Sequence, residues 1–384
     1  MNNNFTINYI ENSSKVGIEQ HDGKIINIFL PIGVDKKMAE EDEDFIYKLI
    51  NSILPAKKRN IELFGNLNIE NVCEWPIYSE IWLVKDYICH GLYKELEKKY
   101  NINVGGKINW KKTINKKSIL TNDSVFYPEI VYEKQQKINT IITELQKYCL
   151  NLCTIGKYIY KLNIPDFNTD IYISKDSINR YLNILKKELV SCFEDYKKQL
   201  LNSLINILNY YSSNNIETIN SYITYEYHYS WEYMISKIFN NDKVLLKTIL
   251  PKSEYHPQEI GIKSSLIPDT AFIKGDNVYI LDSKYYTLGC MPATSDICKQ
   301  TEYCRSAKNR LKDSGYKLIY NSFILPNKVI NNYSYVGYAN MVGDDGSLYK
   351  VNVVYLDTLN VINLFYDRKI VNNIDFLNNN ECVI

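Results

Sequence analysis

The stretch that decides the fold reads Leu266-Ile-Pro-Asp-Thr-Ala-Phe-Ile-Lys-Gly-Asp-Asn-Val-Tyr-Ile-Leu-Asp-Ser-Lys284. Its two arms are rich in β-branched and aromatic residues, which are typical of β-strands. Gly275-Asp276 between the arms suits a two-residue turn of the primed type, in which positive φ angles are required. The stretch therefore predicts a β-hairpin in which Lys274 pairs with Asn277.

This register would bring two carboxylates and one amine to a single place. Asp269 falls directly opposite Asp282, and directly opposed side chains have Cβ atoms only about 4.5–5.5 Å apart. Lys284 follows Asp282 by two residues and therefore shares its face of the sheet. Two carboxylates this close repel each other unless a cation lies between them, and hard oxygen ligands favour Mg²⁺, with Mn²⁺ as a substitute. The residues predict a metal-dependent hydrolytic site that acts on phosphodiesters.

Helices on both sides of the hairpin add polar side chains to this place. Downstream, one of the three polar residues at 294–296 would cap a helix whose sheet-facing stripe includes Gln300. A buried Gln commonly satisfies hydrogen bonds inside a core, but this helix directly follows the predicted metal-binding strand, so Gln300 is also a candidate site residue. Upstream, residues 229–239 predict a helix with Glu232 at the edge of its apolar stripe.

The hairpin resembles the PD-(D/E)xK motif of nucleases, because Pro268-Asp269 precedes its first strand and Asp282-x-Lys284 ends its second strand. The tripeptide alone is not specific, because other copies of it occur in the chain, such as Asp22-Gly-Lys24 and Asp195-Tyr-Lys197. None of those copies has a Pro-Asp pair one hairpin upstream. An exposed hairpin with ordinary surface charges is the alternative interpretation.

A longer series of motifs resembles the LlaJI-type restriction endonuclease family, which is related to McrC, the nuclease subunit of modification-dependent restriction systems. In order, the motifs are Trp231-Glu232 on a helix, Pro268-Asp-Thr270, Leu281-Asp-Ser-Lys-Tyr-Tyr286 and Asp296-Ile-Cys-Lys-Gln-Thr-Glu-Tyr303. The resemblance is strongest over residues 225–330. Lys85-Asp-Tyr-Ile-Cys-His-Gly-Leu-Tyr93 and Gly106-Lys-Ile-Asn-Trp-Lys-Lys-Thr-Ile114 also resemble the N-terminal half of the family.

The resemblance implies a restriction endonuclease, or a subunit of one, that hydrolyses DNA phosphodiester bonds with Mg²⁺. It implies an α/β fold with a PD-(D/E)xK restriction-endonuclease-like core, in which helices flank a central mixed sheet. The implied partners are double-stranded DNA, a cognate DNA methyltransferase of the same restriction–modification system and a McrB-like AAA+ GTPase subunit. Two other classes stay open: another PD-(D/E)xK nuclease for repair or RNA processing, and a non-catalytic DNA-binding subunit.

The expected catalytic set is Asp269, Asp282, Lys284, Glu232 and Gln300. Asp269 and Asp282 would bind the metal, and Glu232 would bind it directly or through water. Lys284 would orient the attacking water and offset charge on the phosphate, and Gln300 would position that water or the backbone. Glu226 is an alternative to Glu232 as the upstream acid.

Composition limits the other possibilities. The 384 residues have a formal net charge of +1, so DNA binding would have to come from a local basic patch. The chain does not begin with a basic region followed by an apolar core, as a signal peptide would. It also has no apolar run that approaches the roughly 18–20 residues of a membrane span, so we expect a cytoplasmic protein without a membrane partner.

Nine cysteines without C-x-x-C pairs indicate free thiols rather than a zinc site. No phosphate-binding G-x-x-x-x-G-K-[ST] loop occurs, so nucleotide hydrolysis would belong to a partner.

A basic segment lies between Glu97 and Asp123, where the chain has seven lysines and no acid. A charge run is commonly only a solvated face, but this one overlaps a motif of the resembled family. We expect it to contact DNA phosphates. The candidate DNA-binding residues are Lys107, Trp110, Lys111, Lys112, Lys116 and Lys117.

Periodicity divides the chain into three expected segments: an N-terminal α+β module over 1–125, a long helical arm over 126–220 and the nuclease domain over 221–384. Acidic residues 40–44 should open a helix that runs through Ile50. Within the arm, helical patterns extend over 129–160 and over 176–211. The nuclease domain should read helix, hairpin, helix, three strands and a final helix from Thr358.

Overall fold

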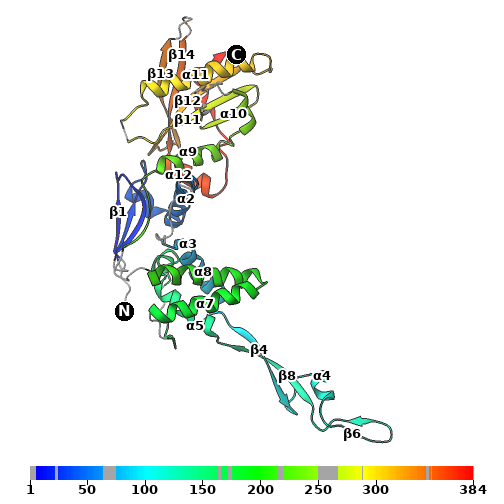
Figure 1. Ribbon diagram of the computed structural model, residues 1–384. Helices are drawn as coiled ribbons and strands as arrows, with labels where there is room; N and C mark the ends of the chain where they lie inside the picture. Colours follow the sequence, from blue (N-terminus) through cyan, green and yellow to red (C-terminus); the bar gives the residue numbers. More distant parts are fainter. Residues whose placement is uncertain are drawn as a thin grey trace, which may run out of the picture. The chain divides into compact units, whose positions relative to one another are not determined.

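The computed structural model describes residues 6–21, 25–63, 75–162, 166–171, 175–213, 219–249, 267–287, 289–342, 346 and 348–383. The fold is mixed α/β with several sheets. It divides into two compact units (Figure 1): the first combines Met1–Val72 with Glu217–Ile384, and the second is Cys73–Ile216. The second unit is therefore an insertion in the chain of the first.

The main sheet of the first unit has the order β10-β11-β12-β14-β13, with β15 (Cys382–Val383) paired to β12. β11, β12 and β14 run parallel, whereas the edge strands β10 and β13 are antiparallel to their neighbours. Lys274 pairs with Asn277 across the turn, which confirms the predicted hairpin register. The strands are β10 (Thr270–Lys274), β11 (Asn277–Ser283), β12 (Leu318–Asn327), β13 (Tyr333–Val342) and β14 (Leu348–Asp357).

Helices cover both faces of this sheet. On one face, α10 (Lys243–Ile249) and α11 (Thr294–Leu311) pack on alternate residues of the hairpin, such as Ala271 and Ile280. On the other face, α9 (Tyr227–Ile238) packs through the buried Trp231, whose Nε1 donates a hydrogen bond to the carbonyl oxygen of Ile324 at 3.3 Å. Because strand residues alternate between faces, Asp282 and Lys284 point to the side of α11.

A second sheet of this unit joins two chain segments that are distant in sequence. It has the order β1-β3-β2-β9, where β9 (Asn220–Thr224) pairs antiparallel with β2 (Val16–His21). β1 (Thr6–Ile10) and β3 (Ile25–Phe29) complete it. The long helix α2 (Phe45–Leu63) contacts this sheet, and it also contacts α9 and α12 (Thr358–Tyr366).

The expected helix over the acidic residues 40–44 is wrong. α1 (Lys36–Glu41) ends there, and α2 begins only at Phe45. Asp42 has extended backbone angles, its carboxylate accepts a hydrogen bond from the backbone N–H of Asp44, and it pairs with Lys48 at 2.7 Å. This local hydrogen bonding separates two helices, as short polar side chains often do.

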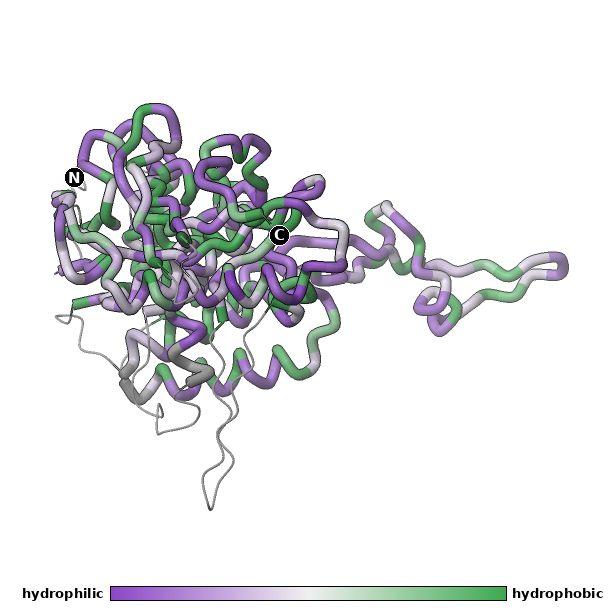
Figure 2. Tube along the Cα trace, turned by 90° about the horizontal axis from the view of Figure 1, so that it is seen from above, coloured by the Kyte–Doolittle hydropathy of each residue, from purple (hydrophilic) through white to green (hydrophobic). Residues whose placement is uncertain are grey.

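The second unit is a group of helices with an extended ribbon, which consists of a three-stranded sheet and a two-stranded sheet. Apolar residues such as Leu83, Leu145, Leu185 and Leu204 share one core. The helices are α3 (Ile77–His90), α5 (Ile141–Leu152), α6 (Thr154–Ile159), α7 (Lys175–Ser191) and α8 (Asp195–Ser213). The ribbon elements are β4 (Glu95–Ile102), β5 (Lys107–Ile108), α4 (Trp110–Ile114), β6 (Ile119–Leu120), β7 (Val125–Phe126) and β8 (Val131–Ile138). Along this ribbon, green and purple stretches alternate (Figure 2).

Two expectations for the helical arm are corrected. Residues 131–138 form the strand β8 rather than a helix, because they pair along their whole length with β4, a partner that local periodicity does not show. The pattern over 176–211 is two helices, α7 and α8, and Phe193 lies in the break with 90% of its surface exposed.

The expected three-segment division also differs from the structure. A boundary after residue 125 would fall inside β7 and separate β4 from its partner β8, and a boundary at 220 would detach β9 from its partner β2. The compact units instead change at residues 72 and 216. In the described part of the chain, no helix is both long and apolar enough to cross a membrane.

Candidate active site

The two predicted carboxylates meet at the open end of the hairpin. Asp269 immediately precedes β10, and the register that pairs Thr270 with Leu281 places it opposite Asp282. The Asp269 Oδ2 atom accepts a hydrogen bond of 2.7 Å from the backbone N–H of Ser283. This bond fixes one carboxylate against the strand that carries the other.

Lys284 lies between Asp282 and a further carboxylate. Its Nζ atom is 2.7 Å from Asp282 Oδ2 and 3.3 Å from Asp296 Oδ1. Asp296 is in the first turn of α11, where its Oδ2 atom also accepts hydrogen bonds from the hydroxyl of Tyr286 and the backbone N–H of Ala293, both at 3.1 Å. Asp296 thus holds the lysine from the helix while Asp282 holds it from the strand.

Sequence reasoning identified Asp296 only as a possible helix cap. It does stabilise the helix start, since it accepts from the N–H of the residue before Thr294, but its position beside Lys284 was missed. A signal was present: Asp296 and Gln300 are four residues apart, and this spacing puts both on one face of the helix.

The electrostatics indicate three acids in one neighbourhood. Burial raises the pKa of Asp269 well above its usual range, and the carboxylates of Asp282 and Glu232 raise it further. Burial likewise raises the pKa of Asp282, although the Lys284 ammonium opposes this. Burial alone would lower the pKa of Lys284, but Asp282, Asp296 and Asp269 together raise it, so the amine stays charged.

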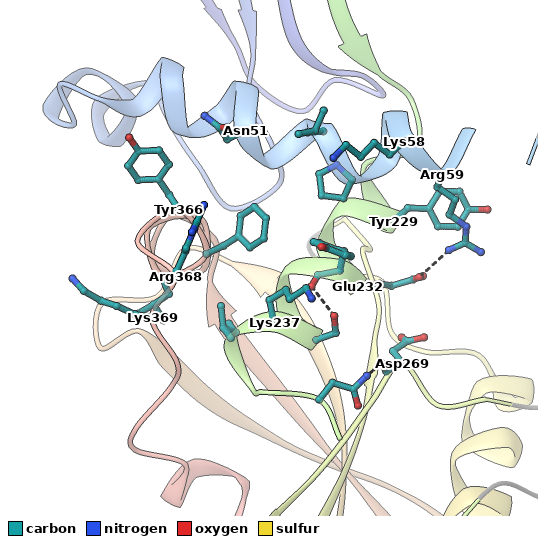
Figure 3. A pocket seen from close by; sticks show the side chains of 18 of the residues that line it. Asn51, Lys58, Arg59, Tyr229, Glu232, Lys237, Asp269, Tyr366, Arg368 and Lys369 are labelled. Atoms are coloured by element: carbon teal, nitrogen blue, oxygen red, sulfur yellow. Dashed lines mark hydrogen bonds and ion pairs between the residues drawn. The ribbon is translucent and has the colours of Figure 1, made fainter. Parts of the chain in front are cut away.

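Glu232 projects from α9 toward the same neighbourhood. Burial raises the pKa of Glu232, Arg59 lowers it and Asp282 raises it. Its carboxylate lies 3.6 Å from the Arg59 guanidinium, and Figure 3 shows the Glu232 and Asp269 side chains on one wall of a cavity. Glu226 stands at the start of α9 and acts on His228 instead, raising its pKa against the effect of burial. Glu232 therefore interacts electrostatically with Asp269 and Asp282, and its role as the upstream acid stays a prediction.

Gln300 is fully buried between α11 and the sheet. Its Nε2 atom donates to the carbonyl oxygens of Ile280 at 3.4 Å and Ser322 at 3.3 Å, which ties the helix to β11 and β12. Its Oε1 atom has no hydrogen-bond partner among the described residues. Gln300 therefore has the structural role that buried glutamines commonly have, and one acceptor atom remains for a further contact.

The paired carboxylates fit a metal ion. Two buried, opposed carboxylates supply the hard oxygen atoms that Mg²⁺ prefers. Burial and the repulsion by Asp282 raise the pKa of Asp269, and a cation between the two carboxylates would offset that repulsion. Within the described ranges, no three His, Cys, Asp or Glu side chains are arranged to hold a metal. Asp269 and Asp282 fit as a pair, and a third ligand role for Glu232, which faces Arg59, stays a prediction.

The candidate DNA-binding residues lie in the second unit, on β5, α4 and the following loop. Trp110 is 56% exposed. Two of the lysines are already engaged, because Lys112 lies over the Tyr100 ring and Lys116 pairs with Glu129 at 3.0 Å. Lys107, Lys111 and Lys117 have no ion pair with any acid that the structure describes.

Comparison with known proteins identifies the family of the chain. The chain belongs to the LlaJI restriction endonuclease family, whose sequence model matches residues 16–358. It is 24% identical over 307 residues to the type II restriction enzyme BsuMI component YdjA of Bacillus subtilis strain 168. That match covers 73% of this chain, and the chain spans 64% of the length of the relative.

A solved half-complex of Thermococcus gammatolerans McrB AAA+ hexamers with bound McrC also shows some similarity. The match has 15% sequence identity and covers 89% of this chain and 77% of the other. Its TM-score of 0.36 is too low to establish a shared fold.

Proposed function

We propose that this protein is the nuclease subunit of a restriction system and hydrolyses DNA phosphodiester bonds with Mg²⁺, using a PD-(D/E)xK core. The observation that carries the proposal is the opposed pair Asp269 and Asp282, with the Lys284 ammonium 2.7 Å from Asp282 on the same face of the sheet. Family membership supports DNA as the substrate. Fold alone would not support a function.

The residues would act in distinct roles. Asp269 and Asp282 would hold Mg²⁺, which when bound supplies positive charge to the phosphate and acidifies water. Lys284, held by Asp282 and Asp296, would stabilise the negative charge that builds up on the phosphate in the transition state. Gln300 would orient the hairpin strand, and its Oε1 atom is available to accept a hydrogen bond from water.

The test is plasmid cleavage with Mg²⁺ by wild type, Asp282→Ala and Lys284→Ala. We expect both variants to lose cleavage while DNA binding stays within a few-fold, because most affinity comes from remote backbone contacts. Lys317→Ala is the matched control, since Lys317 pairs with Asp276 at the far end of the same hairpin. Cleavage at wild-type rates by a highly purified Asp282→Ala protein would refute the assignment.

We further propose a McrB-like AAA+ GTPase subunit and a DNA methyltransferase as system partners. The similar Bacillus protein is itself named as one component of a restriction enzyme. Cleavage assays with and without GTP and the products of neighbouring genes test this, with the DNA ends mapped by sequencing. If the isolated protein cuts as fast and as selectively as the mixture, the GTPase subunit is not required.

A further inference from the structure

A cavity of about 1340 Å³ opens beside two of the candidate catalytic acids (Figure 3). Its walls come from α2, α9 and the end of α12, all in the first unit. Glu232 and Asp269 line it, whereas Asp282 and Lys284 lie outside its wall. The cavity exceeds the roughly 300–1,000 Å³ of sites for small ligands, so it fits a segment of a polymer better than a small molecule.

Positive charge dominates this cavity. Beside the two acids, its lining contains five basic side chains: Lys58, Arg59, Lys237, Arg368 and Lys369. Arg59 is paired with Glu232, and Lys369 is paired with Asp367 at 2.8 Å. Lys58 and Arg368 form no ion pair with any acidic side chain in the part of the chain that the structure describes. Lys237 forms none either and lies over the Tyr233 ring, so three cations face the space without a protein counter-charge.

Arg368 is held in a costly conformation. It follows the last residues of α12 with a φ angle of 56°, in the left-handed region that glycine and asparagine adopt more easily. Backbone N–H groups of Arg368 and Lys369 close the helix end by donating to the carbonyl oxygens of Phe365 at 3.2 Å and Leu364 at 2.9 Å. Glycine would close the same turn with less strain, so the backbone does not explain why an arginine occupies this position. A function of its side chain would explain it.

Aromatic side chains line the cavity together with these cations. Tyr229, Tyr233, Phe365 and Tyr366 also line the cavity, and the Arg59 guanidinium stacks 3.7 Å from the centre of the Tyr229 ring. Proteins that bind single nucleic-acid strands commonly combine cations, which bind the phosphates, with aromatic rings, which stack on the bases or sugars.

We propose that this cavity binds the sugar–phosphate backbone of the DNA strand beside the scissile phosphate, with Lys58 and Arg368 as phosphate ligands. This inference rests on the proposed nuclease function and adds to it the path of the substrate. The strand would enter between α2 and the end of α12 and reach Asp269 and Glu232. Arg59 is then placed to exchange its contact with Glu232 for a phosphate oxygen as the strand arrives.

The test uses the full-length protein with the variants Lys58→Ala, Arg368→Gly and their combination. Binding to a fluorescent DNA duplex is measured in EDTA over a range of salt concentrations, and cleavage is measured with Mg²⁺. We expect the combined variant to lower the slope of log K against log salt by about 0.9 for each phosphate that is no longer neutralised. KM should rise several-fold while kcat changes little, because these side chains bind ground state and transition state alike.

Two controls keep the result interpretable. Lys57→Ala removes the neighbouring cation of α2, which lies over the Tyr222 ring and not in the cavity, and should leave both slope and KM unchanged. Arg368→Gly should melt no lower than wild type, since glycine accepts the positive φ angle, so weaker binding cannot reflect misfolding. A wild-type slope and KM in the combined variant would overturn the inference. A wild type that neither binds nor cuts DNA would instead overturn the proposed function itself.

Discussion

At the scale of single residues, Asp269 makes the stability of the metal-free protein depend on pH. Its raised pKa means that the native state holds a proton that the unfolded state has lost. Its contribution to stability is therefore fully present below the ordinary aspartate pKa of about 3.9 and is lost as pH rises through the higher native pKa. Asp269→Asn keeps the acceptor for Ser283, so in EDTA it should melt higher than wild type at neutral pH. Thermal melts from pH 5 to 8 check this.

Magnesium should reverse the order of the melting temperatures of wild type and Asp269→Asn. A ligand that binds only the native state stabilises it by about 2.7 kcal/mol at one hundred times its dissociation constant. Wild type should gain stability in this way, whereas Asp269→Asn should gain much less because one metal ligand is neutral. Equal Mg²⁺ effects on the melting temperatures of both proteins would mean that Asp269 is not a ligand.

Glu80 should make the stability of the second unit depend on pH as well. It is fully buried, and burial raises its pKa to about 8 even though Trp75 and Tyr211 donate hydrogen bonds to it. The stability that it contributes is complete below its unfolded pKa and is lost as pH rises through about 8. Each pKa unit between the folded and unfolded states corresponds to about 1.4 kcal/mol. The free energy of unfolding should therefore fall by several kcal/mol as pH rises from the unfolded pKa of Glu80 to about 8.

The measurement is urea unfolding of wild type and Glu80→Gln between pH 6 and 9. Glutamine keeps the acceptor oxygen but cannot ionise, so its free energy of unfolding should vary less with pH. Glu144→Gln is a suitable control, because Glu144 pairs with Lys147 near the surface of the same unit. Parallel pH profiles for wild type and Glu80→Gln would show that Glu80 already ionises in the native state.

At the scale of elements, the sequence predicts those whose partners lie close in the chain. The two-residue turn at Gly275-Asp276 fixes the register of the hairpin, and with it the meeting of Asp269 and Asp282. β8 was missed, because its Lys, Gln and Glu residues favour a helix locally and its partner β4 is 29 or more residues away in the pairing. Asp296 was missed for a similar reason: its contact with Lys284 depends on how α11 docks on the sheet.

The basic element around α4 separates its lysines into two groups that can be tested against each other. Lys107, Lys111 and Lys117 form no ion pair in the described part of the chain. Lys98 and, more weakly, Lys107 nevertheless lower the pKa of Glu133, which is the neighbour of Lys107 in the register. Lys112 and Lys116 are engaged with Tyr100 and Glu129. Changing the first three to Gln should weaken DNA binding and lower its log–log salt slope by about 0.9 for each phosphate contact. Changing the engaged pair to Gln should have a smaller effect. Identical slopes in all variants would make this a solvated face.

At the scale of the whole molecule, the first unit depends on two distant chain segments. Ser52 and Tyr227 are joined by a hydroxyl–hydroxyl hydrogen bond of 2.8 Å, and the Ala56 N–H donates to Ser230 Oγ at 3.2 Å. A fragment of residues 217–384 would expose the surfaces of α9 and β9 that α2 and β2 cover. We expect that fragment to unfold without cooperativity in circular dichroism melts, and co-expression with residues 1–72 to restore a cooperative transition. A cooperative melt of the fragment alone would show that 217–384 is an autonomous domain.

The insertion of the second unit also sets the timing of assembly on the ribosome. About 160 residues separate the end of α2 from the start of α9. At roughly 5–20 residues per second, α2 and the edge of β2 wait about 10 to 30 seconds for their partners. During that interval the apolar side chains Leu49, Ile53 and Ala56, which are buried in the finished fold, are without the helices that cover them. The nascent chain is therefore a natural client for chaperones. The paired carboxylates of the hairpin emerge later still, after α9 has met α2.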